Sequence, residues 1–405
     1  MTVTVVCDVL GEENNGTSVA SYNLIRYLKK QGHTVRVLCA DQSKSGEENF
    51  FVVPNRSFGK FIDSIVRRVG VSLAKPDKAI IERALNGCDH VHVMMPLCLG
   101  TAAVEIARER DISITAGFHM QAENFTAHIK LSKVGFVNNL VYRYIYKHVY
   151  RYADGIHYPT EFIKDVFESR IGVSTDGCVI SNGVNSCVKR RKTEKPEELK
   201  DKIVILSTGR FSSEKSQDTL IKAVKRSKHR DAIQLIFAGQ GTKEKQYKRL
   251  SKSLPVKPVF KLFERSEINN VLNYCDLYVH PAVAELEGIA CLESIACGKL
   301  TIVSDSEKSA TKNFAIDGKC IFRRRSAKDL ARVIDYWIDR PTERAEYEEK
   351  YFNSAVAFDS DECMRKMEEM IKTANAGHSF KYSAFRAEAE AYAENAHTVA
   401  YSFRE

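Results

Sequence analysis

Short runs rich in Val and Ile alternate with amphipathic helical stretches along most of the chain. Apolar runs between turn residues are typical of strands buried on both faces, and an i, i+3, i+4 spacing is typical of helices. In the first part of the chain the pattern predicts a helix over Val19–Lys30 and strands over Thr2–Cys7, Thr34–Cys39, Phe50–Val53, His90–Met94, Ile112–Phe118 and Ile156–Tyr158. This alternation indicates a parallel sheet with helices on both faces.

The segment Cys187–Lys202 interrupts the alternation, because it is polar and charged and has no apolar period. We interpret it as a linker. The alternation then restarts, with strands expected over Ile203–Ser207, Gln234–Ala238, Leu277–His280 and Leu300–Val303. The sequence therefore predicts two Rossmann-like α/β domains, over residues 1–186 and 187–375, and a tail over 376–405 that packs back on the first domain or is partly disordered.

Composition and charge narrow the class of protein. The 405 residues are 44% hydrophobic and 28% charged, as in a soluble globular protein. The formal net charge of +9 suggests an anionic partner such as nucleotide phosphate, nucleic acid or lipid headgroups. Eleven scattered cysteines without a CxxC pair argue against a disulfide framework or a zinc ribbon and favour a reducing cytosol. The first residues read as a strand and not as a signal peptide, and no apolar run approaches the roughly 18 residues of a spanning helix.

Two glutamates frame the segment that follows the third strand of the second domain. Glu285 and Glu293 enclose Gly288, which stands at the expected start of a helix. A glycine lets the backbone approach a ligand closely, and the first amides of a helix favour an anion such as phosphate. We expect the amides of Gly288, Ile289 and Ala290 to face such an anion. The two carboxylates would hold opposite ends of one ligand.

A second motif, Gly209-Arg-Phe-Ser-Ser-Glu-Lys215, directly follows the strand Ile203–Ser207. Arg210 and Lys215 suit a diphosphate, because Arg offers a bidentate fork and Lys a point charge. A surface charge pair with a helix cap explains either motif alone equally well. Their order, in the second of two Rossmann-like halves, favours a ligand site at the carboxyl ends of the strands.

Together these motifs resemble those of the retaining glycosyltransferases of family 4, which have the GT-B fold: two Rossmann-like domains with parallel sheets facing across a cleft. The resemblance covers nearly the whole chain. The matching segments are a Gly-containing loop ending at Gly16, Asn182-Gly-Val184, Gly209–Lys215, Gly239-Gln-Gly241 and Glu285–Glu293. It implies an enzyme that takes a sugar from a nucleotide donor and needs no metal or other cofactor.

The resemblance also implies a role for each matched residue. Glu285 and His119 would be the catalytic residues that contact the donor sugar. Arg210 and Lys215 would neutralise the donor diphosphate, and Glu293 would hold the ribose. The remaining donor-binding residues would be Gly16, Phe263, Glu264, Gly288, Ile289 and Ala290.

The sequence departs from the family at Glu287, where the family usually has Phe. An extra carboxylate beside the donor sugar leaves the identity of that sugar open. The Glu-Leu-Glu-Gly form, with Ser306 and Ser309-Ala-Thr311 after the next strand, looks most like the glycolipid-forming members that glucosylate diacylglycerol or sterols.

Two basic amphipathic stretches lie in the first domain, over Phe58–Val69 and Asn124–Ala153, and the second contains no acidic residue. The second also carries a stripe of tyrosines, from Tyr142 to Tyr150. Such helices either pack on a core with a solvated basic face or lie on anionic headgroups, with aromatic rings at headgroup level. Nucleic acid is a third alternative. The membrane-binding residues expected from this pattern are Lys60, Arg67, Arg68, Arg143, Lys147 and Arg151.

We therefore expect a cytoplasmic enzyme, peripheral on the inner face of the cell membrane. It would transfer a hexose, glucose by this resemblance, from a UDP-sugar to a lipid acceptor such as diacylglycerol, with retention. One alternative is a transferase that acts on a cell-wall or capsular polysaccharide intermediate. Another is a nucleic-acid-binding protein, but this has no use for the paired glutamates, so we expect no nucleic-acid partner.

Two further patterns are better explained without a metal. Asp359-Ser-Asp361 spells a DxD motif, but it lies in a polar loop where a turn or helix cap is expected. His90 and His92 share one strand face without a third ligand, so we expect core or rim histidines.

Overall fold

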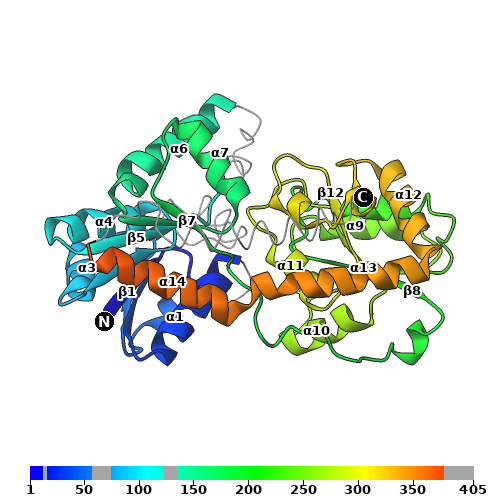
Figure 1. Ribbon diagram of the computed structural model, residues 1–405, viewed down its shortest axis with the longest axis horizontal. Coiled ribbons are helices and arrows are strands. Elements are labelled where there is room, and N and C mark those ends of the chain that lie inside the picture. The colour runs from blue at the N-terminus through cyan, green and yellow to red at the C-terminus, as the bar shows by residue number, and fades with distance from the viewer. Residues whose placement is uncertain (12–15, 57–73, 123–134, 378–405) are drawn as a thin grey trace. The chain divides into compact units, whose positions relative to one another are not determined.

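The computed structural model describes residues 1–11, 16–56, 74–122 and 135–377. The chain divides into two compact units: Met1–Asn182 with the helix Ser360–Asn375, and Gly183–Asp359. Figure 1 shows the elements of each unit. The expected helix over Phe58–Val69, with Lys60, Arg67 and Arg68, lies outside the described residues, as does the chain beyond residue 377.

The described part of the first unit contains one sheet of seven parallel strands, in the order β3-β2-β1-β4-β5-β6-β7. The strands are β1 (Thr2–Cys7), β2 (Thr34–Cys39), β3 (Phe50–Val52), β4 (His90–Val93), β5 (Ser113–Gly117), β6 (Gly155–Tyr158) and β7 (Gly177–Val179). Val5 in β1 pairs with Val37 on one side and with His92 on the other, so the order reverses between β1 and β4. Ligands of open parallel sheets bind at the carboxyl ends beside such a reversal.

Helices follow most of these strands. They are α1 (Gly16–Lys30), α3 (Lys78–Leu85), α4 (Cys98–Glu109), α6 (Gly135–His148) and α7 (Glu161–Ile171). Local signals define their ends: the Thr160 hydroxyl accepts the amide of Ile163 at the start of α7, and Gly172 ends that helix with a φ of 76°.

One more helix, α14 (Ser360–Asn375), belongs to the first unit although it follows the whole second unit in sequence. It lies beside α1 (Figure 1). Met364, Met367 and Ile371 on one of its faces join the core formed by β1, β2 and α1. The sequence placed this helix in the second domain, over 187–375, and the structure differs because the apolar face of α14 packs on the first core.

The second unit, Gly183–Asp359, is described throughout and contains one sheet of six parallel strands, in the order β10-β9-β8-β11-β12-β13. The strands are β8 (Ile203–Thr208), β9 (Ile233–Ala238), β10 (Val259–Lys261), β11 (Leu277–His280), β12 (Thr301–Ser304) and β13 (Ile321–Phe322). The helices are α8 (Gln217–Val224), α9 (Glu244–Leu250), α10 (Arg265–Tyr274), α11 (Ile289–Ala296), α12 (Ala327–Ile338) and α13 (Pro341–Ser354).

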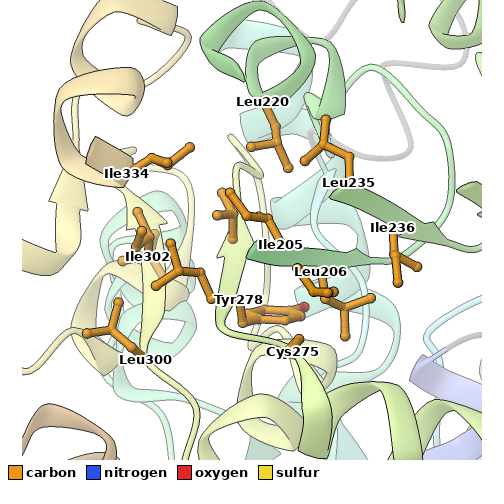
Figure 2. Close-up of a cluster of buried hydrophobic side chains, with 14 of the residues drawn as sticks. Ile205, Leu206, Leu220, Leu235, Ile236, Cys275, Tyr278, Leu300, Ile302 and Ile334 are labelled. Carbon is orange, nitrogen blue, oxygen red and sulfur yellow. The ribbon is translucent and has the colours of Figure 1, made fainter. Parts of the chain in front are cut away.

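Figure 2 shows the core of this unit, where apolar side chains of the sheet meet those of the helices that cover it. Ile205 of β8, Leu235 of β9 and Ile302 of β12 are buried there. Leu220 of α8 and Ile334 of α12 pack on the sheet. Burial on both strand faces is why these strands appear in the sequence as continuous apolar runs.

The expected linker is bound along α10. The amides of Lys189 and Arg191 donate to the side-chain oxygens of Asn269 and Asn273, at 3.3 and 2.7 Å. The Asn273 amide group donates to the Lys189 carbonyl at 3.0 Å. The segment therefore belongs structurally to the second unit, and the two units meet in sequence at Asn182 and Gly183.

Every strand expected from the sequence is present, with ends within one residue of the prediction. The two parallel sheets confirm the predicted α/β class. None of the helices that the structure describes has the length and apolar character needed to span a bilayer.

Candidate active site

The candidate site lies at the carboxyl edge of the second sheet, where the order reverses between β8 and β11. The loop after β8 and the loop after β11 meet there, because the amide of Val283 donates to the carbonyl of Glu214 at 2.7 Å. Both sequence motifs therefore lie on adjoining loops, as expected for a ligand site of this fold class.

Three glycines allow the loop after β8 to pack tightly against the end of β9. Gly209, Gly239 and Gly241 have φ angles of 132°, 153° and 159°. A Cβ on Gly239 would lie 2.2 Å from the Gly209 carbonyl oxygen, and one on Gly241 would lie 2.6 Å from the Phe211 carbonyl oxygen. Since both neighbours are backbone atoms, only glycine fits without shifting this loop.

The loop after β8 presents two cations in different environments. The Arg210 side chain is exposed and makes no hydrogen bond or ion pair with any residue in the described ranges. The Lys215 ammonium forms an ion pair with Glu285 Oε1, and the two side chains are 18% and 12% exposed. The structure thus brings Lys215 and Glu285 together, 70 residues apart in sequence.

Glu285 is held through both its side chain and its backbone. Oε1 also accepts from His280 Nε2 at 2.8 Å. Burial raises the pKa of Glu285, but Lys215 and His280 outweigh it and lower the pKa to about 2. The Glu285 amide donates to the Lys308 carbonyl at 3.1 Å, and its carbonyl accepts from the amide of Ala310 at 3.0 Å. The carboxylate is therefore ionised and fixed at the sheet edge.

Gly288 caps the start of α11 with a φ of 94°, and a Cβ there would lie 2.5 Å from the Thr311 methyl group. The amides of Gly288, Ile289 and Ala290 donate to no atom of the described residues. Three unbonded amides at a helix start form a site for an anion or a sugar oxygen.

Glu293 lies within α11 and is partly buried. Burial raises its pKa, and the positive charge of Arg265, the first residue of α10, opposes that effect. No hydrogen bond or ion pair engages its carboxylate within the part of the chain that the structure describes. This carboxylate is available to a hydroxyl-bearing ligand.

The two residues expected at the base differ in their surroundings. Phe263 is partly buried against the core, with the Lys261 ammonium 4.8 Å from its ring centroid. Glu264 is exposed and forms the N-cap of α10 in a capping box with Glu267. The Glu264 side chain therefore already has a local structural role.

In the first unit, Asp8 follows β1 at the order reversal and is buried. Its carboxylate accepts the amides of Leu99 and Gly100, in the first turn of α4, at 3.0 and 3.3 Å. Burial raises the pKa of Asp8 to about 6, and these hydrogen bonds oppose the rise. Gly16 is exposed and is the first residue of α1.

His119 lies just beyond β5 and is buried. Its Nε2 atom makes no hydrogen bond within the described residues, and a Cβ on Gly117 would lie 2.6 Å from that atom. The His119 and His157 rings are 5.3 Å apart, edge to face. Burial and the neighbouring His157 hold the pKa of His119 well below its usual value, so this imidazole is neutral.

His90 and His92 are buried, and their Nδ1 atoms bond Ser113 and Thr115 at 2.7 and 2.8 Å. The prediction of core histidines is confirmed. Asp361 lies in the first turn of α14. Among the described residues, no group of three or more His, Cys, Asp or Glu side chains is arranged to hold a metal ion.

The described part of the second basic stretch contains α6, with Arg143 and Lys147 exposed on it and Arg151 exposed just after it. The tyrosines of the expected stripe do not share that face. The Tyr142 and Tyr150 rings are buried, and both pack against Phe167. The prediction that these tyrosines lie at the level of lipid headgroups was therefore wrong, because Tyr142 and Tyr150 pack in a buried aromatic cluster.

The residues that support Glu285 from behind stand outside the motifs recognised in the sequence. Tyr278 and His280 lie two residues apart on one face of β11, and their side chains are hydrogen-bonded to each other behind Glu285. The sequence provides only a weak indication of this role for His280, which is a histidine at the end of a predicted strand, five residues before Glu285. Asp8, directly after β1, carried a similar strand-end signal.

Comparison with known proteins agrees with this architecture. Residues 14–186 match the family described as Glycosyltransferase Family 4, and residues 188–353 match the one described as Glycosyl transferases group 1. A curated relative is the GDP-mannose-dependent alpha-(1-6)-phosphatidylinositol dimannoside mannosyltransferase of Mycobacterium tuberculosis. It is 29% identical over 142 residues, which are 34% of this chain and 36% of that protein. The chain spans about a third of the length of the curated relatives it matches.

Solved structures share the fold. Anabaena HepE in complex with UDP-glucose superposes with a TM-score of 0.71 at 15% identity, over 92% of this chain and 100% of that one. The catalytic domain of cholesterol-alpha-glucosyltransferase from Helicobacter pylori is 40% identical over 38% of this chain and 98% of that one, but its TM-score of 0.36 is too low to carry an inference. The two family matches and the two parallel sheets identify the chain as a glycosyltransferase of the GT-B type, with a Family 4 domain followed by a group 1 domain.

Proposed function

We propose that this chain transfers a glucosyl group from UDP-glucose to a hydroxyl of a membrane lipid such as diacylglycerol, with retention of configuration. One observation carries the proposal. The exposed Arg210, the Lys215–Glu285 ion pair and the unbonded amides from Gly288 to Ala290 gather at one edge of the second sheet. Cations, free amides and a carboxylate are the groups that a diphosphate and a sugar together require.

The donor's glycosidic bond breaks as negative charge grows on the diphosphate. Arg210, Lys215 and the amides of α11 are suited to stabilise that charge, and the helix holds the amides in place before the reaction begins. In this proposal the cationic side chains supply the positive charge, and no metal or other cofactor is required.

The sugar and the nucleoside need acceptors as well as cations. We assign Glu285 to hydroxyls of the donor sugar and Glu293, whose carboxylate is not engaged by the described residues, to the ribose. Phe263 is assigned to the base, whereas Glu264 is the weaker assignment because it caps α10. Gly16 and His119, of the first unit, are assigned to the diphosphate and the sugar.

A lipid acceptor is supported by the outer face of α6. Leu140 and Tyr144 are 50% and 57% exposed there, beside the exposed cations Arg143 and Lys147. Basic and apolar side chains on one helix face suit the interface of an anionic membrane. The mycobacterial relative is named for a phosphatidylinositol dimannoside acceptor, which is also a lipid. We propose that the protein is cytoplasmic and works at the inner face of the cell membrane.

The test is a transfer assay with the full chain, labelled UDP-glucose, UDP-galactose or GDP-mannose, and vesicles that contain diacylglycerol or a sterol. Chromatography of the lipid extract should show label from UDP-glucose in a diacylglycerol glycoside. Label only from GDP-mannose, or only in a polysaccharide intermediate, would replace the proposed donor or acceptor.

A matched pair of variants ties the activity to the site. Glu285→Gln should abolish transfer, because it removes the charge that faces the reacting sugar and leaves the core unchanged. Glu244→Gln makes the same change on α9, where Glu244 pairs with Lys248 at the surface, and should leave transfer unchanged. Near-normal turnover by Glu285→Gln would refute this assignment of the site.

A further inference from the structure

A line of hydrogen bonds runs from the ends of β8 and β11 to the candidate site. The Thr208 hydroxyl lies 2.7 Å from the Tyr278 hydroxyl, which lies 3.2 Å from His280 Nδ1. His280 Nε2 in turn lies 2.8 Å from Glu285 Oε1. The His280 side chain is only 2% exposed and the Tyr278 side chain is fully buried. These groups are therefore fixed by the sheet and not by solvent.

The bonding pattern determines which atom donates to Glu285. A carboxylate without a proton only accepts, so the Nε2–H of His280 must be the donor. With a neutral imidazole, Tyr278 donates to Nδ1 and Thr208 donates to Tyr278. With a charged imidazole, the two outer bonds reverse and Nε2–H still donates. The support that Glu285 receives is therefore the same in both protonation states.

Both side-chain bonds to Glu285 end on the same oxygen. Oε1 accepts from Lys215 and from His280, whereas no described residue donates to Oε2. The fixed oxygen leaves Oε2 available to a hydroxyl. The imidazole also lies next to the start of α11, since a Cβ on Gly288 would be 3.8 Å from His280 Nε2.

We propose that His280 is a positioning residue, which keeps the Glu285 carboxylate aligned when Lys215 turns toward the donor diphosphate. This inference rests on the proposed function, because it takes the donor to be a nucleoside diphosphate sugar. The Lys215 side chain is flexible, and in this proposal it binds both the Glu285 carboxylate and the donor diphosphate. His280 is rigid and buried, so its bond to Oε1 persists and Oε2 stays directed at the sugar.

Three variants separate positioning from general stability. His280→Phe keeps an aromatic ring but removes the donor, and kcat should fall about 100-fold, the usual effect of misplacing a reacting group. His280→Gln places an amide donor near the position of Nε2 and should recover most of that loss. Affinity for UDP, measured by calorimetry, should change less than twofold in both variants.

His229→Phe is the matched control. His229 Nε2 also lies 2.9 Å from a carboxylate oxygen, that of Asp339, but it precedes β9 at the opposite edge of the same sheet. The kcat of His229→Phe should equal that of the wild type. Tyr278→Phe, which removes only the hydroxyl behind His280, should lower kcat by about 10-fold with unchanged UDP affinity, and it preserves the test if His280→Phe fails to fold.

The outcomes are distinct. Equal kcat for His280→Phe, His280→Gln and the wild type would overturn the inference and leave the proposed function standing. A loss of UDP affinity as large as the loss of kcat in Tyr278→Phe and His280→Gln would also overturn it, because the histidine would then support diphosphate binding. Absence of transfer from every nucleotide sugar by the wild type would refute the proposed function itself.

Discussion

Arg210 and Lys215 lie on one loop, yet their surroundings give them different roles in the free protein. The Arg210 side chain makes no hydrogen bond or ion pair within the described residues, whereas Lys215 compensates the charge of Glu285. Arg210→Ala should weaken UDP binding by ~1.5–3 kcal/mol, the usual value for hydrogen bonds to charged groups, and leave the melting temperature unchanged. Lys215→Ala should weaken UDP binding similarly and also lower the melting temperature, because a partly buried carboxylate loses its partner.

Calorimetry with UDP and thermal unfolding of the two variants check this difference. Lys222→Ala is the control, since Lys222 pairs with Asp218 on the surface of α8. Unchanged UDP affinity in both Arg210→Ala and Lys215→Ala would exclude their diphosphate role. Equal melting temperatures would contradict the stabilising role of the Lys215–Glu285 pair.

Asp8 gives a prediction about pH. Its pKa is raised from 3.8 to about 6 in the folded chain, so the protonated form is favoured by folding. This contribution to stability is present below the unfolded pKa and is lost as pH rises through about 6. Asp8→Asn keeps an oxygen for the amides of Leu99 and Gly100 but has no proton to lose.

The wild type should therefore lose on the order of 3 kcal/mol of unfolding free energy relative to Asp8→Asn between pH 4 and pH 7. Urea unfolding of both proteins across this range measures the difference. Parallel pH dependence of the two proteins would show that Asp8 does not titrate differently on folding.

The residues of the candidate site could be predicted where they belong to a sequence motif. Those that reach the site only through tertiary packing could not. Arg210, Lys215 and Glu285 stand in recognisable segments beside strand ends, and two of them are in contact. His280 contacts Glu285 only because the loop after β11 folds back toward the strand end. That path is set by bonds to Lys308 and Ala310, which come from the loop after β12. No local pattern in the sequence encodes such a contact.

Among the elements, the sequence predicted all the interior strands but only one of the four edge strands, β3. β1 is buried along nearly its whole length and appears as a run of Val. The strands β7, β10 and β13 were not predicted. They have two or three residues each, and those of β7 and β10 are partly or fully exposed. An edge strand need not carry the continuous apolar run that burial on both faces requires, and of the four only β3 consists of three apolar residues.

The helix α6 illustrates a second limit, because its sequence carries more than one apolar stripe. The buried ring of Tyr142 packs against Phe118 and Phe167, which lie outside the helix in sequence. Leu140 and Tyr144 are left exposed as a result. The sequence therefore predicted the exposed cations but assigned the wrong aromatic residues to the outer face.

This face of α6 should bind anionic membranes. Replacing Arg143 and Lys147 together by Ala should weaken binding to vesicles with anionic lipid by ~2 kcal/mol, about 30-fold, since each cation near the surface contributes about 1 kcal/mol. Raising the salt concentration should release the wild type, because this attraction is screened. Sedimentation with vesicles measures both effects.

The control is the double change Lys245→Ala and Arg249→Ala, which removes two exposed cations at the same helical spacing from α9. It should sediment like the wild type. Equal sedimentation of both double variants, or no preference of the wild type for anionic lipid, would make α6 an ordinary solvated surface and favour a soluble acceptor.

At the scale of the whole molecule, the last described helix returns to the unit in which the chain begins. The sequence predicted two tandem domains but assigned α14 to the second. Its apolar residues, Cys363, Met364, Met367, Met370 and Ile371, form a stripe that would suit either core. Which core it joins depends on the path of the chain from α13 through Asp359, and the helix pattern contains no information about that path.

Hydrogen exchange can test this assignment, because a cavity destabilises the core in which it lies. Met367 is 2% exposed in the core of the first unit, and Met367→Ala should cost ~2–5 kcal/mol. Slowly exchanging amides of β1, β2 and α1 should then exchange at least about 30-fold faster, and those of β8 and β11 should not change. Leu330→Ala, a similar truncation on the buried face of α12, should give the opposite pattern, because Leu330 lies in the core of the second unit. If Met367→Ala instead accelerated exchange in β8 and β11 alone, α14 would belong to the second domain, as the sequence had indicated.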